Sequence, residues 1–246
     1  MNTEPSMQRR ALVTGASGGI GRAIAERLAR DGAHVIVHAN TRLEAAQSIV
    51  AAIVAEGGSA EAIAFDVTDR AAAQSACERL VAAAGAIQIV VNNAGVHDDA
   101  AFPALRQAQW SRVIDVSLNG FFNVTQPLVM PMIRTRWGRI VNLSSVAAIA
   151  GNRGQVNYAA AKGAINSATK ALALELASRG ITVNAVAPGL IDAGMAASFD
   201  QAAIEKIVPM KRAGNAAEVA ALVAFLASDE AGYISGQVVS INGAMI

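Results

Sequence analysis

The stretch ALVTGASGGIG, Ala11 to Gly21, decides the fold, because it joins an apolar, strand-like run to the helical pattern RAIAERLARDG. Its glycines are spaced GxxxGxG. Without side chains they permit a tight turn, close packing of a helix on a strand, and close approach of a phosphate group to backbone N–H groups. Between the first strand and the first helix of an alternating α/β chain, such a turn favours dinucleotide binding over a purely structural bend.

Outward from this turn, short β-branched runs alternate with longer alanine-rich helical patterns. Strands joined by helical crossovers pair in parallel, because each crossover returns the chain to the same end of the sheet. Runs such as VIVH and IVVN are apolar on both faces, which is typical of a sheet covered on both sides. The sequence therefore predicts an α/β fold with a single-domain, doubly wound, parallel seven-stranded Rossmann sheet. The expected strands are Ala11–Thr14, His34–His38, Ala60–Phe65, Ile87–Asn92, Arg139–Leu143, Ile181–Val186 and Gln237–Ile241, and the expected helices are Gly19–Asp31, Arg42–Glu56, Asp69–Ala84, Gln107–Arg136, Val156–Arg179 and Ala216–Ala227.

Composition and charge exclude several classes of protein. The chain has 246 residues, of which 20 are Lys or Arg and 19 are Asp or Glu, so it has no excess of positive charge to follow a nucleic-acid backbone. No apolar run reaches the roughly 18 residues that cross a bilayer. The N-terminus MNTEPSMQRR lacks the apolar segment of a signal peptide, and Cys77 has no second cysteine to pair with. We expect a cytoplasmic protein with no nucleic-acid, membrane or metal partner.

The length of the chain fits one α/β domain. Because no linker rich in Pro or Ser divides it, we expect a flexible tail over residues 1–8 and one domain over residues 9–246. The stretch 190–215 has no firm helix or strand pattern. A stretch of this length in a compact domain is often functional, and we expect it to be a substrate flap.

The end of the second expected strand bears on the choice of cofactor. A carboxylate there would bind the 2′-hydroxyl of NAD and repel the 2′-phosphate of NADP. The strand ends instead at HANTR, residues 38–42, which offers neutral side chains such as Asn40 and one cation, Arg42. This favours NADP. The alternatives are NAD as the cofactor and Arg42 as an ordinary solvated residue of the next helix.

Tyr158 and Lys162 lie four residues apart near the start of a long helical pattern, which places them on one face of the helix. A lysine ammonium beside the phenol is expected to lower the pKa of Tyr158 toward neutral pH, so that Tyr158 can serve as a proton donor. Ser144 and Ser145 follow the fifth expected strand, at the carboxyl edge where open α/β sheets bind ligands. A serine hydroxyl there can hydrogen-bond a carbonyl oxygen as it gains negative charge. By itself, a Tyr and a Lys at this spacing are usually part of an ordinary helix surface.

Six elements occur together in the order that is typical of one family. They are TGASGGIG, Asp66-Val67, NNAG at residues 92–95, Ser145, Tyr158-x-x-x-Lys162 and Pro188-Gly189. In these the chain resembles the short-chain dehydrogenase/reductase family over nearly its whole length. Within that family, GNRGQVNYAAAKGAI and the ending SGQVVSINGAMI are similar to the 3-oxoacyl-acyl-carrier-protein reductases. The strings DDAAFPAL, QPLVMPMI and APGLIDAGM are similar to the variants found with aryl polyene synthesis.

The resemblance implies a role for each matching position. Ser145 would orient the substrate carbonyl, Tyr158 would protonate it, and Lys162 would bind the nicotinamide ribose and tune Tyr158. For Asp66 the alternative is a strand-end carboxylate that accepts local N–H groups, and for Asn93 it is a buried turn amide. Together with Asn40 and Arg42 from the second strand, the cofactor-binding positions would be Gly15, Ser17, Gly18, Gly19, Ile20 and Gly21 at the pyrophosphate, Asp66 and Val67 at the adenine, Asn93, Ala94 and Gly95 beside the adenosine ribose, and Pro188, Gly189 and Ile191 at the nicotinamide.

Three positions depart from the family's pattern. The family usually has an Asn that holds a proton-relay water near the lysine, where this chain has Ser117. We count Ser117 among the catalytic candidates, and we do not expect Asn119 to substitute, because it faces another side of the helix. Gly18 stands where many NADP-specific relatives have a basic residue, and Asp98 stands where close relatives often have Arg.

The resemblance implies NADPH-dependent reduction of a 3-oxoacyl thioester, linked to an acyl carrier protein, to the 3-hydroxyacyl thioester. The carrier is expected to dock on Arg136, Arg139 and Arg179, taken as lying at element ends near the site. A homotetramer is also implied, with subunits packed through the Gln107–Arg136 and Val156–Arg179 helices and through the C-terminal strands. One alternative is an NAD-linked alcohol or hydroxysteroid dehydrogenase with the same machinery. Another is a non-catalytic dinucleotide-binding regulator, which Ser117 alone favours.

Overall fold

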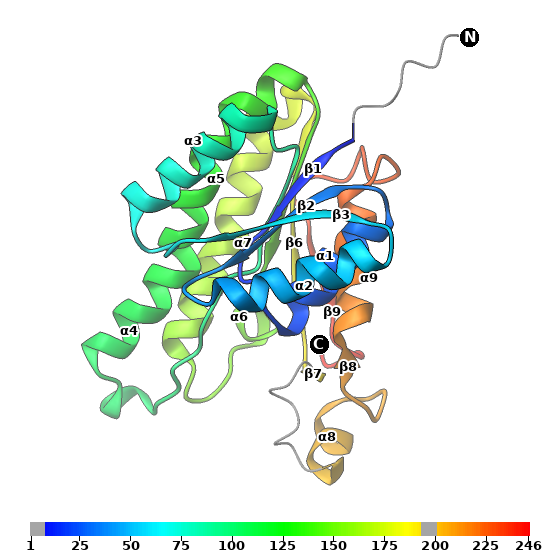
Figure 1. The fold of residues 1–246 in the computed structure, drawn as a ribbon. Coiled ribbons are helices and arrows are strands. Elements are labelled where there is room, and N and C mark those ends of the chain that lie inside the picture. The colour runs from blue at the N-terminus through cyan, green and yellow to red at the C-terminus, as the bar shows by residue number, and fades with distance from the viewer. Residues whose placement is uncertain (1–7, 193–200) are drawn as a thin grey trace.

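A computed structural model describes residues 8–192 and 201–246 and contains a seven-stranded sheet between two layers of helices (Figure 1). The strand order is β3-β2-β1-β4-β5-β6-β9, and every neighbouring pair is parallel. The order of the strands reverses between β1 and β4, and open α/β sheets bind ligands outside the carboxyl ends of the strands at such a point. The predicted doubly wound Rossmann sheet is therefore confirmed. The strands are β1 (Arg10–Val13), β2 (His34–Ala39), β3 (Ser59–Ala64), β4 (Ile89–Asn92), β5 (Gly138–Leu143), β6 (Ile181–Pro188) and β9 (Val238–Ile241).

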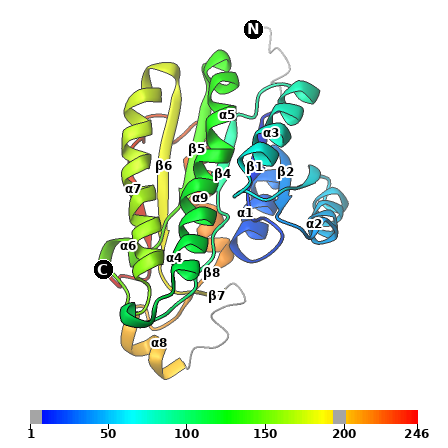
Figure 2. The same ribbon diagram turned by 90° about the vertical axis from the view of Figure 1, so that its left-hand side faces the viewer.

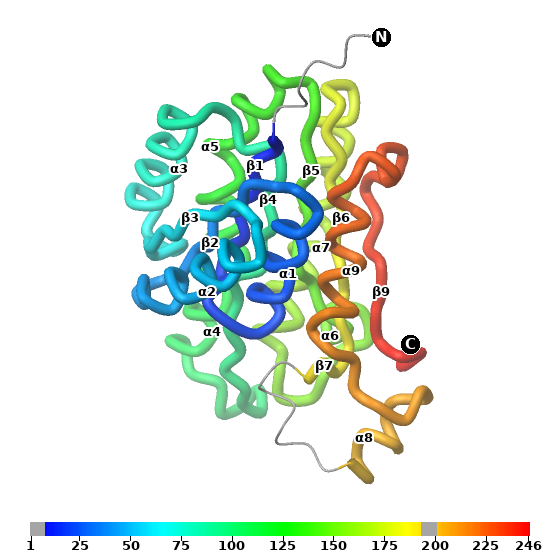
Figure 3. Tube along the Cα trace, turned by 45° about the vertical axis from the view of Figure 1, so that its right-hand side comes forward, coloured from blue at the N-terminus to red at the C-terminus, as the bar shows by residue number. Residues whose placement is uncertain are grey.

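One layer of helices covers each face of this sheet. On one face, Ile24 and Val223 belong to the buried cluster that α1, α2 and α9 form with the strands. On the other, Leu128 and Leu176 belong to the cluster of α3, α5 and α7. Figure 2 looks onto the α3, α5 and α7 layer, and Figure 3 brings α1, α9 and β9 forward. The helices are α1 (Gly19–Arg30), α2 (Leu43–Ala55), α3 (Arg70–Ala84), α5 (Gly120–Thr135), α7 (Val156–Leu176) and α9 (Ala216–Ala227).

The helix predicted over Gln107–Arg136 is wrong in one respect, because it is interrupted. α4 (Gln107–Ile114) is followed by a π-helical turn, η2 (Asp115–Asn119), and then by α5. A π-helical turn holds one residue more than an α-helical turn and is frequent at functional sites. The helix ends at Thr135, because Arg136 adopts a left-handed conformation with φ of 51°.

The described parts of the stretch 190–215 contain three short elements that its sequence pattern does not predict. β7 (Ile191–Asp192) pairs in parallel with β8 (Gly214–Asn215), which brings the two ends of the stretch together. Between them lies the short helix α8 (Gln201–Ile207), below the carboxyl edge of the sheet in Figure 1. Residues 193–200 lie outside the described part of the chain.

Two further short elements were not predicted, η1 (Phe102–Ala104) and α6 (Ala147–Ala150). The helix expected over Val156–Arg179 consists of α7 and a final 3₁₀ turn, η3 (Ala177–Arg179). Of the tail expected over residues 1–8, residues 1–7 lie outside the described part, and the side-chain amide of Gln8 donates a hydrogen bond to the carbonyl of Gly32. Within the described residues, no helix combines the length and apolar character that a membrane span requires.

Candidate active site

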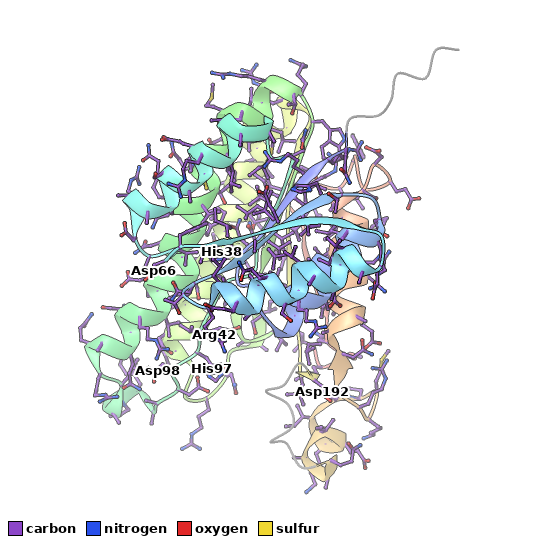
Figure 4. All side chains as sticks on the ribbon, in the orientation of Figure 1. His38, Arg42, Asp66, His97, Asp98 and Asp192 are labelled. Carbon is purple, nitrogen blue, oxygen red and sulfur yellow. The ribbon has the colours of Figure 1, made fainter. Side chains whose placement is uncertain are left out.

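The candidate site lies at the carboxyl edge of the main sheet, where the glycine turn leaves β1. Gly15 has φ of 62°, a left-handed conformation that favours glycine. A Cβ on Gly15 would lie 3.0 Å from the Cα of Ala94, and a Cβ on Gly21 would lie 2.5 Å from the Nδ2 of Asn93. The segment after β4 therefore approaches the turn too closely for any other residue at these two positions. Figure 4 shows the charged and imidazole side chains labelled around this edge: His38, Arg42, Asp66, His97, Asp98 and Asp192.

The glycine turn is held from one side by Asn93 and Thr14. The Asn93 amide donates to the carbonyls of Thr14 and Gly15 at 2.8 and 3.1 Å. The Thr14 hydroxyl accepts from the backbone N–H groups of Asn93 and Ala94, both at 3.0 Å. Asn93 therefore acts as the turn amide considered as the alternative. Both of its side-chain N–H groups bind the turn, so neither is free to bind a ribose.

The start of α1 forms an open cradle beside this turn. Gly18 is the N-cap of α1, and no side chain caps its first N–H groups. A Cβ on Gly18 would meet no atom within 4 Å, so this face of the turn is unobstructed. Ser17, Gly19 and Ile20 lie in the same loop and first turn. Uncapped N–H groups at the N-terminus of a 12-residue helix suit an anion such as a pyrophosphate.

Residues expected at the adenine lie after β3. Asp66 is exposed, and its Oδ1 accepts from the backbone N–H and the hydroxyl of Thr68, both at 2.8 Å. Oδ1 of Asp66 thus accepts local hydrogen bonds, as the alternative for this residue supposes. Oδ2 accepts no hydrogen bond from the described residues. Val67 is buried, and its carbonyl accepts from the Asn123 amide at 2.9 Å.

The end of β2 differs from the prediction at one residue. Asn40 and Arg42 are exposed, and no described residue forms an ion pair or hydrogen bond with the guanidinium of Arg42. His38, the first residue of the stretch 38–42, is only 1% exposed. Its Nδ1 accepts from the N–H of Gly15 at 3.1 Å, and its Nε2 lies 2.9 Å from the carbonyl of Phe65. His38 is therefore not available to a ribose.

Ser145, Tyr158 and Lys162 converge next to the cradle. Tyr158 and Lys162 share α7, and the Lys162 Nζ lies 5.8 Å from the centroid of the Tyr158 ring. The Ser145 hydroxyl lies near the Tyr158 phenol and favours its ionised form. Ser144, in contrast, is buried, and its hydroxyl donates to the carbonyl of Lys162 at 3.4 Å. Ser145 is thus the serine that faces the tyrosine.

Burial governs the protonation of Tyr158 and Lys162. The pKa of Tyr158 is raised from its ordinary 10.0, chiefly by burial. The neighbouring Ser145 hydroxyl opposes the rise, and the charge of Asp99 adds to it. The expectation that Lys162 lowers this pKa is wrong for this structure, because burial raises the pKa and Lys162 is not among the groups that shift it. The ammonium of Lys162 instead donates to the carbonyl of Leu143. Burial also lowers the pKa of Lys162 from 10.5 to about 8. A phenol with a raised pKa stays protonated at neutral pH, which a proton donor requires.

Comparison with known proteins agrees with this geometry. Residues 9–203 match the family described as short chain dehydrogenase. The chain belongs to this family. It is 46% identical over 243 residues to the 3-oxoacyl-acyl-carrier-protein reductase FabG of Aggregatibacter actinomycetemcomitans, which covers 97% of this chain and 100% of that protein. It is 46% identical over 238 residues to the protein of the same name from Escherichia coli (96% of each chain), and 43% identical over 242 residues to that from Staphylococcus aureus (97% and 98%).

Membership of the short-chain dehydrogenase family implies a nicotinamide dinucleotide cofactor, and the residues present fit one. The glycine turn and the uncapped start of α1 suit its pyrophosphate. The ammonium of Lys162 has a single acceptor, the carbonyl of Leu143, among the described residues, so it retains N–H groups for a ribose hydroxyl.

The end of β6 and the residue after it are hydrogen-bonded to the turn that carries Ser145 and to β9. The carbonyl of Pro188 accepts from the N–H of Val146, at 2.8 Å, and the N–H of Gly189 donates to the carbonyl of Ile241, at 2.9 Å. Pro188 and Gly189, which with Ile191 are expected at the nicotinamide, thus bind the turn that carries Ser145 and β9. Ile191 also begins β7, at the base of the stretch 190–215.

Ser117, where short-chain dehydrogenases usually have Asn, lies in the π-helical turn η2. It is 4% exposed, and its Oγ has no hydrogen-bond partner among the described residues. A Cβ on Gly95 would lie 3.2 Å from the Nζ of Lys162 and 3.6 Å from the Oγ of Ser117, so both polar groups face one point beside Gly95. Asn119 is exposed and donates to Asp115 at 2.7 Å, facing away from the site.

The arginines expected near the site lie at the opposite edge of the sheet. Arg136 and Arg179 follow α5 and α7 and immediately precede β5 and β6, at the amino ends of these strands. At 1.5 Å per residue, α7 separates Arg179 from Tyr158 by about 30 Å. Arg139 is 4% exposed and donates to the carbonyl of Ser228, so it cannot meet a carrier protein. The prediction that these three arginines lie near the site of their own subunit is therefore wrong. The docking role predicted for Arg139 is wrong as well.

Two polar residues near Tyr158 were given no role from the sequence: Asp98, which was named only as a departure from close relatives, and Asn157. The carboxylate of Asp98 accepts from Gln109 at 2.7 Å and lies 3.6 Å from Arg112, so it is turned toward α4. Asn157, fully buried, donates to the carbonyls of Asp98 and Gln109 and accepts from the N–H of Tyr158. The sequence shows that Asn157 lies next to Tyr158. Its hydrogen-bond partners are 48 and 59 residues away, so no sequence pattern indicates that it binds them.

Proposed function

We propose that this chain reduces 3-oxoacyl thioesters borne by an acyl carrier protein to 3-hydroxyacyl thioesters, with NADPH as the reductant. The observation that carries the proposal is the convergence of Ser145, Tyr158 and Lys162 beside the glycine cradle. The names of the relatives that are 43 to 46% identical over nearly the whole chain support the substrate class.

In this mechanism the protein positions the substrate carbonyl and supplies its proton. When bound, the nicotinamide dinucleotide supplies a hydride. The hydroxyl of Ser145 lies near that of Tyr158, so a substrate carbonyl oxygen placed between them would meet both groups. As that oxygen gains negative charge, Ser145 stabilises it by a hydrogen bond and Tyr158 transfers its proton to it. The raised pKa of Tyr158 keeps the phenol protonated until that moment.

The proposed preference for NADPH rests on the end of β2. Asn40 and Arg42 are exposed there, no carboxylate occupies residues 38–42, and the guanidinium of Arg42 has no partner among the described residues. Arg42 is also the N-cap of the 13-residue helix α2, and no side chain caps it. A 2′-phosphate would thus meet a cation and a helix N-terminus together.

Steady-state rates with NADPH and with NADH, each against a panel of 3-oxoacyl thioesters, test this proposal. We expect turnover with NADPH on the 3-oxoacyl substrates and a higher KM for NADH. A panel that includes aryl-conjugated polyene thioesters examines the similarity to the aryl polyene variants. Tighter binding of NADH than of NADPH would contradict the cofactor assignment, and activity confined to simple secondary alcohols with NAD would favour the alcohol dehydrogenase alternative.

We propose that Ser117 takes part in resupplying the proton to Tyr158. Its buried hydroxyl and the ammonium of Lys162 both face the point beside Gly95. A hydroxyl can donate and accept, so a water bound there would link the two groups. This role distinguishes an active enzyme from the regulator alternative, in which Ser117 would have ended turnover.

The proposed homotetramer uses apolar side chains on the outer faces of the helices. Phe122 and Met130 on α5 are 47% and 57% exposed, and Leu174 on α7 is 85% exposed. A two-fold axis would pair these helices antiparallel, because an isologous contact joins the same patch on both subunits. The C-terminal ends of α5 and α7 would then lie beside the start of α7 in the partner. Light scattering that gives the mass of a stable monomer would contradict this assembly.

In this pairing Arg136 and Arg179 would again be placed to bind the carrier protein. Both are exposed, and in an antiparallel pair they would lie near the partner subunit's site rather than their own. An acidic carrier could then meet them. Reversing both charges should weaken turnover on the carrier-bound substrate and leave turnover on a small thioester analogue unchanged. Equal losses on the two substrates would count against docking.

A further inference from the structure

His38 is an unusual residue for the interior of a parallel sheet. It lies near the end of β2, it is only 1% exposed, and it is polar. Buried polar groups in proteins are nearly always hydrogen-bonded, and both nitrogens of this ring are. The N–H of Gly15 donates to Nδ1 at 3.1 Å, and Nε2 lies 2.9 Å from the carbonyl of Phe65.

These partners fix the form of the imidazole. Because Nδ1 faces an N–H group, it must accept, and because Nε2 faces a carbonyl, it must carry the hydrogen. The ring also packs against the side chain of Phe65, with 4.2 Å between the ring centroids. Burial lowers the pKa of His38 to about 4, against the smaller opposing effects of the Phe65 carbonyl and of Asp66. The ring is therefore neutral, and its tautomer is fixed, at physiological pH.

The two partners of the ring belong to the two segments that meet the adenosine half of a dinucleotide. Gly15 opens the glycine turn of the pyrophosphate cradle, and the carbonyl of His38 itself accepts from the next N–H of that turn, that of Ala16, at 2.8 Å. Phe65 directly precedes Asp66 and Val67. Figure 4 shows His38 and Asp66 at the same edge of the sheet.

No other side chain among the described residues joins these two segments by hydrogen bonds. Asn93 holds the glycine turn but does not reach the segment after β3. Asn123 holds the carbonyl of Val67 but does not reach the turn. The backbone of β2 also binds both segments, through the carbonyls of His38 and Ala39, which accept from the N–H groups of Ala16 and Phe65. Among the side chains of the described residues, the imidazole of His38 is the one that bridges the cradle and the adenine segment.

We propose that His38 is a positioning residue, which holds the pyrophosphate turn and the adenine segment at the separation that the ADP part of the cofactor spans. It touches no reacting atom, so it should act on cofactor affinity and not on the chemical step. A fixed separation favours a ligand that contacts both segments, because less freedom is lost when it binds. A ligand that contacts only one segment should gain little from it. This inference rests on the proposed dinucleotide site.

The test compares His38→Phe with the wild-type protein. Phenylalanine fills the volume of the ring and removes both hydrogen bonds, each of which is typically equivalent to about a fivefold change in an equilibrium constant. We expect the Kd of NADPH and of ADP to rise by about 10-fold to 30-fold, with kcat at saturating NADPH unchanged. Adenosine alone and pyrophosphate alone, measured by competition with NADPH fluorescence, should lose no more than about threefold.

His34→Phe is the matched control. His34 lies on the same strand and the same face as His38, about 13 Å nearer the amino edge at roughly 3.3 Å per residue. Its ring nitrogens contact Ser59 and Glu61 at 2.7 and 3.2 Å, so the same substitution also removes two polar contacts between β2 and β3. We expect it to leave the Kd of ADP unchanged.

Two further variants keep the test decisive if His38→Phe does not fold. His38→Gln offers a carbonyl and an N–H at a similar reach and should restore the Kd of ADP to within about threefold of wild type. His38→Asn is too short to reach both partners and should fall between Gln and Phe. ADP affinity that falls in the order His, Gln, Asn would support the proposed bridge, that is, the positioning of the two segments by the His38 ring.

Three results would overturn the bridge: an unchanged Kd of ADP in His38→Phe or His38→Asn, an equal loss for adenosine and ADP, or an equal effect of His34→Phe. Each of these leaves the proposed function intact, because wild-type binding is unaffected. Failure of the wild-type protein to bind NADPH and ADP would instead overturn the dinucleotide site and the bridge with it.

Discussion

Lys162 should make the folded protein less stable than it would be without the ammonium. The side chain lies on α7, is 3% exposed, and donates its one hydrogen bond among the described residues to the carbonyl of Leu143. Burial lowers its pKa from 10.5 to about 8. A shift of one pKa unit corresponds to about 1.4 kcal/mol, so keeping this ammonium charged in the fold opposes folding by about 3 kcal/mol.

The sign of this effect determines its pH dependence. Unfolded, Lys162 keeps its proton up to pH 10.5, whereas in the fold it loses it near pH 8. Between these values the unfolded chain binds more protons, so the free energy of unfolding should rise with pH. The destabilisation is therefore fully present below about pH 8 and disappears as the pH approaches 10.5.

Lys162→Met keeps most of the side-chain volume and removes the charge. It also removes the hydrogen bond to Leu143, whose loss costs about 1 kcal/mol. We expect the variant to be more stable than wild type by about 2 kcal/mol at pH 7 and equal to it at about pH 10, since these two contributions then nearly cancel. Turnover and cofactor affinity should both fall, because Lys162 is proposed to bind the ribose and to share a relay water with Ser117.

Urea unfolding followed by far-ultraviolet circular dichroism at pH 7, 8, 9 and 10 measures this difference, at one fixed protein concentration so that assembly does not alter it. Lys170→Met is the control, because Lys170 is exposed on the same helix. Its effect on the free energy of unfolding should be small and show no trend over this range. A Lys162→Met variant that is less stable than wild type at pH 7, or that differs from it equally at pH 7 and pH 10, would refute the reasoning.

Three further substitutions test the site. Tyr158→Phe removes the proton donor and keeps the ring, so kcat should fall by about 10² to 10⁴ while the Kd of NADPH, measured by fluorescence, stays unchanged; a variant that retained most of its turnover would rule out Tyr158 as the acid. Ser117→Asn, which restores the usual family residue, should raise kcat and reduce its solvent isotope effect, and a lower kcat would mean that the serine is adapted to this site. Asn40→Asp places a carboxylate at an exposed position after β2 with little change in shape, and the ratio of kcat/KM for NADPH to that for NADH should fall by at least tenfold; an unchanged ratio would remove the end of β2 from cofactor selection.

The sequence by itself determined the class of fold, the glycine turn and the pairing of Tyr158 with Lys162. These features depend on short-range regularities: the period of apolar residues along a strand or helix, the absence of side chains at Gly15 and Gly21, and the spacing of four residues on one helix. Such patterns are written in neighbouring residues, so they can be interpreted without knowing what packs against them.

Tertiary structure alone decided the environment of these residues. The π-helical turn that directs Ser117 toward Lys162, the burial that raises the pKa of Tyr158, and the location of Arg139 beneath Ser228 all depend on residues distant in the chain. His38 illustrates the reason most clearly, since its partners Gly15 and Phe65 lie 23 and 27 residues away. A side chain's protonation and hydrogen bonds depend on the groups that desolvate and contact it, and those groups are brought together only when the sheet and its two helical layers assemble.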